Sequence, residues 1–156
     1  MQARGFSLIE AMIVVAIAGI VAAMTLPRIS SGVRRERSRA EAVKVADTIT
    51  RARNRARVQV CRVQVTIGAA SVALGPDPAD PTVACRTMPS ETVALDAKLV
   101  TLSPFQIGGT ATNPLVFNGD GGVAAASRAR MAIALADASP RVIEVWPAIG
   151  TVRMLP

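Results

Sequence analysis

Apolar and charged positions are unevenly distributed along this chain, and the longest apolar run lies near the N-terminus. From Ala11 to Leu26 the sequence reads AMIVVAIAGIVAAMTL without a charged side chain, and Pro27 follows. Proline tends to end or kink a helix. As a helix, Phe6 to Leu26 would be roughly 31 Å long, close to the hydrocarbon thickness of a bilayer. The pattern predicts a helix over residues 6–27 that crosses a membrane once.

After this run the apolar positions change their spacing. They recur every three or four residues, at Ala42, Val45, Ile49, Ala52 and Ala56. This is the period of one helix face, and residues 34–57 contain no Gly or Pro. We therefore expect residues 28–57 to continue the helix as an amphipathic stem, with a looser joint at residues 30–32.

From residue 58 the period changes to two. Val63, Val65 and Ile67 alternate with polar residues, as in a half-buried strand. Further strands are expected at residues 71–74, 92–102, 114–118, 131–136, 142–146 and 151–155, with a proline-rich loop at 75–81. Several short strands after one helix predict an α+β fold, in which the long helix packs on a small, antiparallel, β-rich head at residues 58–156.

The formal charge of +7 is concentrated in the stem. Residues 28–57 carry ten basic and three acidic side chains, so the head is neutral. A basic stem beside a membrane is expected to contact anionic head groups or acidic surfaces of neighbouring subunits. Arg51 and Arg55 would share one helix face, and Arg53 and Arg57 another, which disfavours one nucleic-acid groove.

Glu10 is the one charged residue beside the apolar run, and it needs an explanation. An acidic residue costs about 2.5–3.5 kcal/mol in the middle of a bilayer, and less near its edge. A cleaved secretory signal and a plain single-pass anchor both fit the apolar run, but neither explains Glu10. Cleavage between Gly5 and Phe6 would create an α-amino group that pairs with Glu10 of a neighbouring subunit.

The stretch GFSLIE, from Gly5 to Glu10, resembles the processing motif of type IV pilins and type II secretion pseudopilins. The resemblance implies that a prepilin peptidase removes residues 1–5 as a leader and methylates the amine of Phe6. It also implies that Glu10, with the helix up to Pro27, guides assembly with other pilins or pseudopilins into a filament. The expected location is the bacterial inner membrane, with the head in the periplasm. The arginines that follow Pro27 contradict this orientation by the positive-inside rule, and the motif is given precedence.

Three further segments resemble the GspH/FimT branch of this family: ARNRARVQVCRVQV, LVFNGDGG and IEVWPAIGTVRM. The resemblance implies a minor pseudopilin of a type II secretion system, whose head contacts other minor subunits or secreted cargo. The alternative is a minor type IV pilin that assists pilus assembly or binds DNA. DNA-binding members tend to carry Gly-Arg-x-Arg near the C-terminus. Here Thr151 follows Gly150 and only Arg153 remains as a DNA contact, which disfavours nucleic acid without excluding it.

The two cysteines, Cys61 and Cys85, leave two interpretations open. In an oxidising periplasm they would form a disulfide that stabilises the head by about 3 kcal/mol. Otherwise they would be two buried thiols that behave as small apolar side chains.

Enzymatic chemistry has little support in the sequence. The chain has no His and no Tyr, and its cysteines lack zinc-site spacing, so we expect no enzyme, no metal and no cofactor. Residues 117–122, FNGDGG, are similar in composition to a phosphate or calcium loop, but no Lys-Ser/Thr pair follows. A tight turn between strands is the expected role of residues 118–122.

Overall fold

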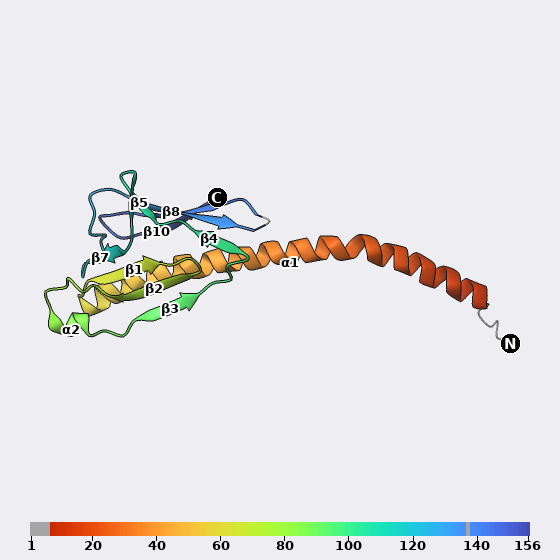
Figure 1. The fold of residues 1–156 in the computed structure, drawn as a ribbon, viewed down its shortest axis with the longest axis horizontal. Coiled ribbons are helices and arrows are strands. Elements are labelled where there is room, and N and C mark those ends of the chain that lie inside the picture. The colour runs from red at the N-terminus through yellow and green to blue at the C-terminus, as the bar shows by residue number, and fades with distance from the viewer. Residues whose placement is uncertain (1–6, 137) are drawn as a thin grey trace.

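A computed structural model describes residues 7–136 and 138–156 of the chain, without the side chains of residues 24–30. One long helix, α1 (Leu8–Gln59), extends from the N-terminal end, and a β-rich head packs around its C-terminal half (Figure 1). The helix has 52 residues and is therefore about 78 Å long. It is continuous through Pro27, as expected of a stem that continues the apolar helix, and through residues 30–32, where the expected looser joint is wrong. A proline removes one backbone hydrogen bond, and the helical residues on both sides outweigh that loss.

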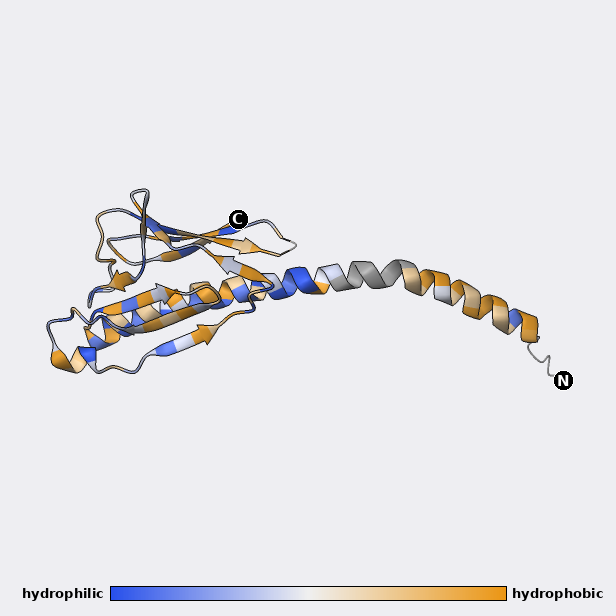
Figure 2. Cartoon of the chain, in the orientation of Figure 1, coloured by the Kyte–Doolittle hydropathy of each residue, from blue (hydrophilic) through white to orange (hydrophobic). Residues whose placement is uncertain are grey.

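The two halves of α1 differ in polarity. The N-terminal half is largely hydrophobic, and the stem that follows is mostly hydrophilic (Figure 2). Among the residues that the structure describes, no helix combines the length and apolar character needed to cross a membrane. The crossing expected of residues 6–27 includes Phe6 and the side chains of 24–30, which lie outside the described residues, so it stays a prediction.

The head contains two antiparallel sheets. Sheet A consists, in spatial order, of β3 (Glu91–Ala94), β2 (Ser71–Pro76), β1 (Val63–Ile67) and β7 (Leu115–Phe117). Sheet B consists of β10 (Val152–Leu155), β9 (Arg141–Val145), β8 (Ala129–Leu135), β5 (Phe105–Ile107) and β6 (Thr110–Thr112), and β4 (Val100–Leu102) also pairs with β8. A short helix, α2 (Val83–Arg86), lies between β2 and β3. The expected fold, a long helix on an antiparallel β-rich head, is confirmed.

The core lies between the stem and the inner faces of both sheets. The expected stripe of the stem is buried throughout: Ala42, Val45, Ile49, Ala52 and Ala56 are each 0–1% exposed. Its largest partners in the sheets are Phe105 and Phe117, both fully buried. Three of the five stripe residues are alanines, which lets the strands approach the helix closely. The stem is therefore part of the folding unit of the head.

One expected strand is two strands in the structure. Residues 92–102 divide into β3 in sheet A and β4 in sheet B. The turn between them is built on Asp96, whose carbonyl oxygen accepts a bond from the Leu99 N–H at 2.9 Å and whose Oδ1 accepts one from the Lys98 N–H at 2.9 Å. The hairpin of β5 and β6, the helix α2 and the extension of β2 to Pro76 were not expected. Gly108 and Gly109, with φ of 59° and 87°, form the turn of that hairpin.

Helix α1 ends on an unusual residue. Val60 caps the helix with φ 52° and ψ 38°, a left-handed conformation that is unfavourable for a β-branched residue. Its side chain is 76% exposed, so packing does not compensate for the strain.

Val60→Gly is therefore expected to raise the free energy of unfolding by about 1 kcal/mol. Val58, two residues earlier, is 83% exposed but lies within the helix. Val58→Gly is expected to lower the same free energy by about 0.5 kcal/mol. Urea unfolding followed by the fluorescence of Trp146, the single tryptophan, measures both. The same sign for the two changes would contradict this account of the cap.

Candidate functional site

The N-terminal end of α1 presents Glu10 in its first turn. Ser7 caps the helix in an extended conformation, and its carbonyl oxygen accepts bonds from the N–H groups of Glu10 at 3.0 Å and Ala11 at 3.2 Å. A carboxylate in the first turn is favoured by the helix dipole. Glu10 is exposed, so its side chain is available to a neighbouring molecule. Gly5 and Phe6, the expected cleavage and methylation residues, lie outside the described residues.

Around and beyond Glu10, the surface of α1 is apolar on every side. Its exposed large apolar side chains are Leu8, Ile9, Met12, Ile13, Val14, Val15, Ile17, Ile20 and Val21, each more than half exposed. Because consecutive residues point in different directions around a helix, this surface forms a continuous sleeve instead of one stripe. A helix of this kind is stable in water only when other apolar groups surround it. Residues 8–23 therefore require an apolar environment on all sides.

The head meets the helix first at Ser38. The Ser38 Oγ lies 2.9 Å from the carbonyl oxygen of Ala136, which follows β8, and 3.0 Å from that of Arg34. The Ser38 side chain is fully buried, whereas residues 31–37 are exposed. The contact marks the point along α1 from which the head covers the helix.

The four arginines near the end of α1 hold the head on two sides, as their spacing predicts. On one side Arg51 forms an ion pair with Glu91 of β3 and another with Asp47 at 3.1 Å. Arg55 contacts Glu91 at 3.3 Å and donates to the Pro89 carbonyl oxygen at 3.1 Å. On this side the arginines connect the helix to the edge of sheet A.

On the other side the helix packs on glycines. Arg53 Nε donates to the Ile149 carbonyl oxygen at 2.9 Å. Gly121, with φ 85°, lies under Arg57 so closely that an added Cβ would overlap the Arg57 side chain. Gly150, with φ 61°, lies against Gly121, and an added Cβ would overlap the Gly121 carbonyl oxygen.

The expected turn at residues 118–122 is present, and its glycines have a packing role. The Asn118 N–H donates to the Gly122 carbonyl oxygen and the Gly121 N–H to that of Asn118, both at 2.8 Å. Asp120 Oδ1 accepts the Gly122 N–H at 2.8 Å. An added Cβ on Gly119 would lie 2.8 Å from the Val60 carbonyl carbon. The FNGDGG segment is thus the surface on which the helix end and the loop after β9 dock.

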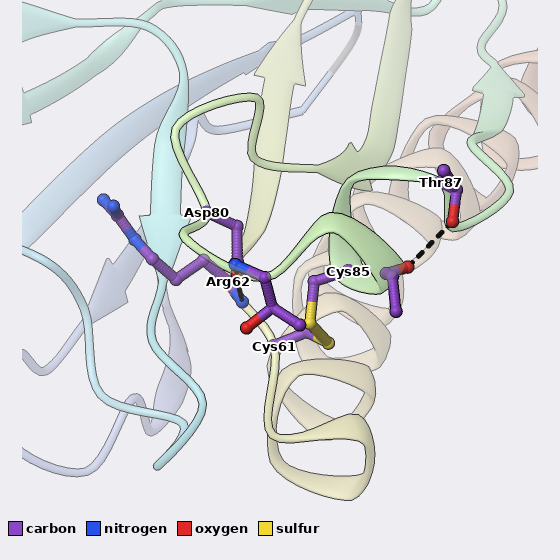
Figure 3. The surroundings of a disulfide bond; sticks show 7 residues. Cys61, Arg62, Asp80, Cys85 and Thr87 are labelled. Carbon is purple, nitrogen blue, oxygen red and sulfur yellow. Dashed lines mark hydrogen bonds between the residues drawn. A yellow bond between two sulfur atoms is a disulfide. The ribbon is translucent and has the colours of Figure 1, made fainter.

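Cys61 and Cys85 are bonded in the structure. Their Cα atoms lie 5.5 Å apart, and the bond joins the end of α1 to α2 (Figure 3). Both residues are buried. The bond therefore connects the core helix to a segment that has few other apolar anchors.

Removal of this bond has a measurable consequence. The double substitution of Cys61 and Cys85 by alanine is expected to lower the free energy of unfolding by about 3 kcal/mol. Mass spectrometry after alkylation with and without reductant tests the bond itself. Alkylation of the folded, unreduced chain would contradict it.

Asp80 organises the loop between β2 and α2. Its Oδ2 accepts the Arg62 N–H at 2.6 Å, and its Oδ1 accepts the Thr82 N–H at 2.7 Å. These two backbone bonds hold the pKa of the Asp80 carboxyl below its ordinary value. Arg62 also forms an ion pair with Asp77 at 3.0 Å. The loop thus depends on a charged Asp80 carboxylate.

The lowered pKa of Asp80 should make the free energy of unfolding depend on pH. A lowered folded-state pKa stabilises the fold above the unfolded pKa, and this stabilisation is lost as pH falls through the folded value. We expect Asp80→Asn to be less stable than the natural chain at about pH 7, and the difference to shrink towards about pH 3. Urea unfolding at several pH values measures it. A difference independent of pH would contradict the role of the carboxylate.

Arg153, the expected DNA contact, lies exposed on β10 opposite Glu144 of β9. Glu144 in turn lies opposite Arg130 of β8. Trp146 and Arg128 complete this group, with the Arg128 Cζ 3.6 Å from the centre of the Trp146 ring. The sequence reasoning named Arg153 but missed the other four residues of this group. The alternation of residues 128–135, together with Glu144 on β9 and Trp146 directly after that strand, was the available signal.

Comparison with known proteins gave one family match, and the comparison with curated proteins gave none. The model of the prokaryotic N-terminal methylation motif matches residues 1–26. Two solved crystal forms of the type IV minor pilin FimU of Pseudomonas aeruginosa are similar in structure. The first has a TM-score of 0.62 at 15% identity and covers 78% of this chain and 90% of FimU. The second has a TM-score of 0.58 at 14% identity and covers 76% and 92%.

The minor pseudopilin EpsH of the Vibrio cholerae type 2 secretion system is also similar. Its TM-score is 0.53 at 14% identity, over 76% of this chain and 95% of EpsH. At these identities the likeness concerns the fold. The chain therefore combines the N-terminal methylation motif of prepilin-type proteins with a pilin-like fold.

Proposed function

We propose that this pilin-like chain is a minor pseudopilin of a type II secretion system, assembled into a periplasmic filament that drives the export of folded proteins. The observation that supports a filament subunit is the exposed apolar sleeve of α1, residues 8–23, which bears Glu10 at its end and is continuous with the stem on which the head packs. The neutral head, with Thr151 after Gly150, supports a pseudopilin over a DNA-binding pilin. Such a sleeve suits the core of a filament, where other helices surround it. Before assembly, the bilayer of the inner membrane would surround it.

Processing would prepare the helix for this role. A prepilin peptidase would cut between Gly5 and Phe6 and methylate the new amine. The amine of one subunit and the Glu10 carboxylate of its neighbour would then pair in an apolar environment, where an unpaired charge is strongly unfavourable. This pairing would fix the register in which helices pack side by side. The helix up to Pro27 would form the packed segment.

The head would determine what the subunit does in the filament. It is held on the stem by the arginine contacts with Glu91 and by the glycine contacts with Arg53 and Arg57. In the periplasm it would contact other minor subunits or secreted cargo.

A minor type IV pilin is the second candidate, because subunits of pili and of secretion filaments share this fold, and FimU as well as EpsH is similar to the chain. In this role the chain would assist pilus assembly or bind DNA.

Secretion in a deletion strain tests the proposal. Loss of folded enzymes from the culture medium, restored by complementation with this chain, would support the pseudopilin. Normal secretion with impaired piliation would support the second candidate. Normal secretion and normal piliation would contradict both.

A further inference from the structure

The face of sheet B that points away from the core carries a row of polar side chains across its strands. Strand pairing places four residues in one row across the sheet. Arg153 of β10 lies opposite Glu144 of β9, Glu144 lies opposite Arg130 of β8, and Arg130 lies opposite Gln106 of β5. Among the side chains described on this face, three arginines, Arg128, Arg130 and Arg153, accompany one carboxylate, that of Glu144. The face therefore has an excess of positive charge, although the head as a whole is neutral.

Glu144 holds two of these arginines in place. Its side chain is only 6% exposed, and its Oε1 lies 2.9 Å from both Nε and Nη2 of Arg130 and 3.6 Å from Nη1 of Arg128. The hydrogen bond from Arg130 keeps the pKa of Glu144 below its ordinary value. The Arg128 guanidinium also stacks on Trp146. Both arginine side chains are about half exposed, so part of each fork still faces solvent. Fixed guanidinium groups of this kind bind carboxylates with little loss of side-chain entropy.

Two hollows flank Arg130. One, of about 430 Å³, is lined by Gln106, Gly108, Gly109, Ser127, Arg128 and Arg130. The other, of about 560 Å³, shares Gln106 and Arg130 and adds the apolar residues Ala132, Val142, Leu155 and Pro156, with Ser103 at its side. The first hollow offers cationic and polar donors, and the second offers an apolar floor beside the same arginine.

We propose that this face binds an acidic segment of a partner protein, with a carboxylate on Arg128 and Arg130 and a neighbouring apolar side chain in the hollow over Ala132. The charge excess selects the acidic group, and the apolar floor selects the residue beside it. The inference deepens the proposed function, because it takes the head as the part of the subunit that meets partners.

A nucleic acid fits this face less well. Single-strand binders stack bases on free aromatic rings. Arg128 already occupies one face of Trp146, the single tryptophan of the chain. The apolar hollow has no counterpart in a phosphate track.

Binding of a model peptide to the purified full chain in detergent tests the proposal. The probe is a fluorescein-labelled peptide of alternating Asp and Leu, and its control is a peptide of alternating Asn and Leu. Fluorescence anisotropy should show saturable binding of the first peptide and at least roughly tenfold weaker binding of the second. Equal binding of the two peptides, or no saturable binding, would overturn the proposal.

Three variants locate the site. Arg130→Gln is expected to weaken binding roughly tenfold. Arg86→Gln makes the same charge change at an exposed position of α2 and should leave binding unchanged. Ala132→Glu, at an exposed position on the floor of the second hollow, should weaken binding by a similar factor without removing a contact of Glu144. If Arg130→Gln unfolds, Ala132→Glu still tests the site. Normal peptide binding by Ala132→Glu would overturn the proposal.

A single-stranded oligonucleotide serves as competitor. Displacement of the peptide at lower concentrations than the unlabelled Asp-Leu peptide requires would assign the face to nucleic acid instead. The binding assay uses purified protein, so its result does not depend on the secretion experiment. Normal secretion in the deletion strain would contradict the secretion role but not the binding of an acidic segment to this face.

Discussion

Gly150→Ala is expected to unfold the head more severely than any other single methyl addition among the described glycines. The new Cβ would overlap the Gly121 carbonyl oxygen and lie 3.1 Å from the Arg53 Cδ, and the backbone at φ 61° is itself unfavourable for alanine. Because the overlap is with backbone, no side chain can move aside to relieve it. We expect the free energy of unfolding to fall by about 3 kcal/mol or more. Urea unfolding followed by Trp146 fluorescence measures the change.

Two other glycines separate the causes of this effect. Gly109→Ala places a Cβ in open space at φ 87°, so it should lower the free energy of unfolding by only about 1–2 kcal/mol, through the backbone alone. Gly119→Ala has no positive φ but meets the Val60 backbone at 2.8 Å, so it tests the crowding alone. If Gly150→Ala were no more destabilising than Gly109→Ala, the close contact of helix and loops would be wrong.

Glu10→Ala is expected to abolish assembly without affecting the fold. Glu10 lies in the first turn of α1, far along the helix from the first head contact at Ser38. In a filament, its loss would leave the amine of a neighbouring Phe6 unpaired in an apolar environment, which is worth about 3–5 kcal/mol. Incorporation into filaments should fall by about two to four orders of magnitude. Immunoblots of the sheared filament fraction against the membrane fraction measure it.

Glu36→Ala is the matched control for this change. It removes the same charge from an exposed stem residue that pairs with Arg39 on the surface, where an ion pair contributes little. Assembly of this variant should be normal, and Trp146 fluorescence should be unchanged in both variants. Normal incorporation of Glu10→Ala, or an equal defect in Glu36→Ala, would contradict the role of Glu10.

Local periodicity predicted most of the fold. The stem stripe from Ala42 to Ala56 and the alternation of Val63, Val65 and Ile67 identified the core faces of α1 and β1. The division of residues 92–102 between two sheets was not predictable in this way, because it depends on which partners each half meets. Pro27 does not end the helix, as the continued stem predicted, because its effect is local and the helical residues on either side decide whether the helix continues. The looser joint expected at residues 30–32 is absent for the same reason.

The candidate sites also differ in how far the sequence could predict them. The N-terminal motif is contiguous in sequence, so it was recognised without a structure. The row of Arg153, Glu144 and Arg130 comes from three strands, and only their register brings it together. The role of Gly121 and Gly150 depends on contacts with Arg57 and Arg53, far away in sequence. Sequence composition predicted a turn at residues 118–122, but its packing against the helix could be seen only in the folded structure.

The N-terminus of the mature chain is the most direct test of the central claim, that the chain is processed and assembled as a pilin-like subunit. Mass spectrometry of the protein purified from its membranes should give a chain that begins at Phe6, with one methyl group on its α-amino nitrogen. A chain that retains residues 1–5, or that begins anywhere other than Phe6, would contradict the claim.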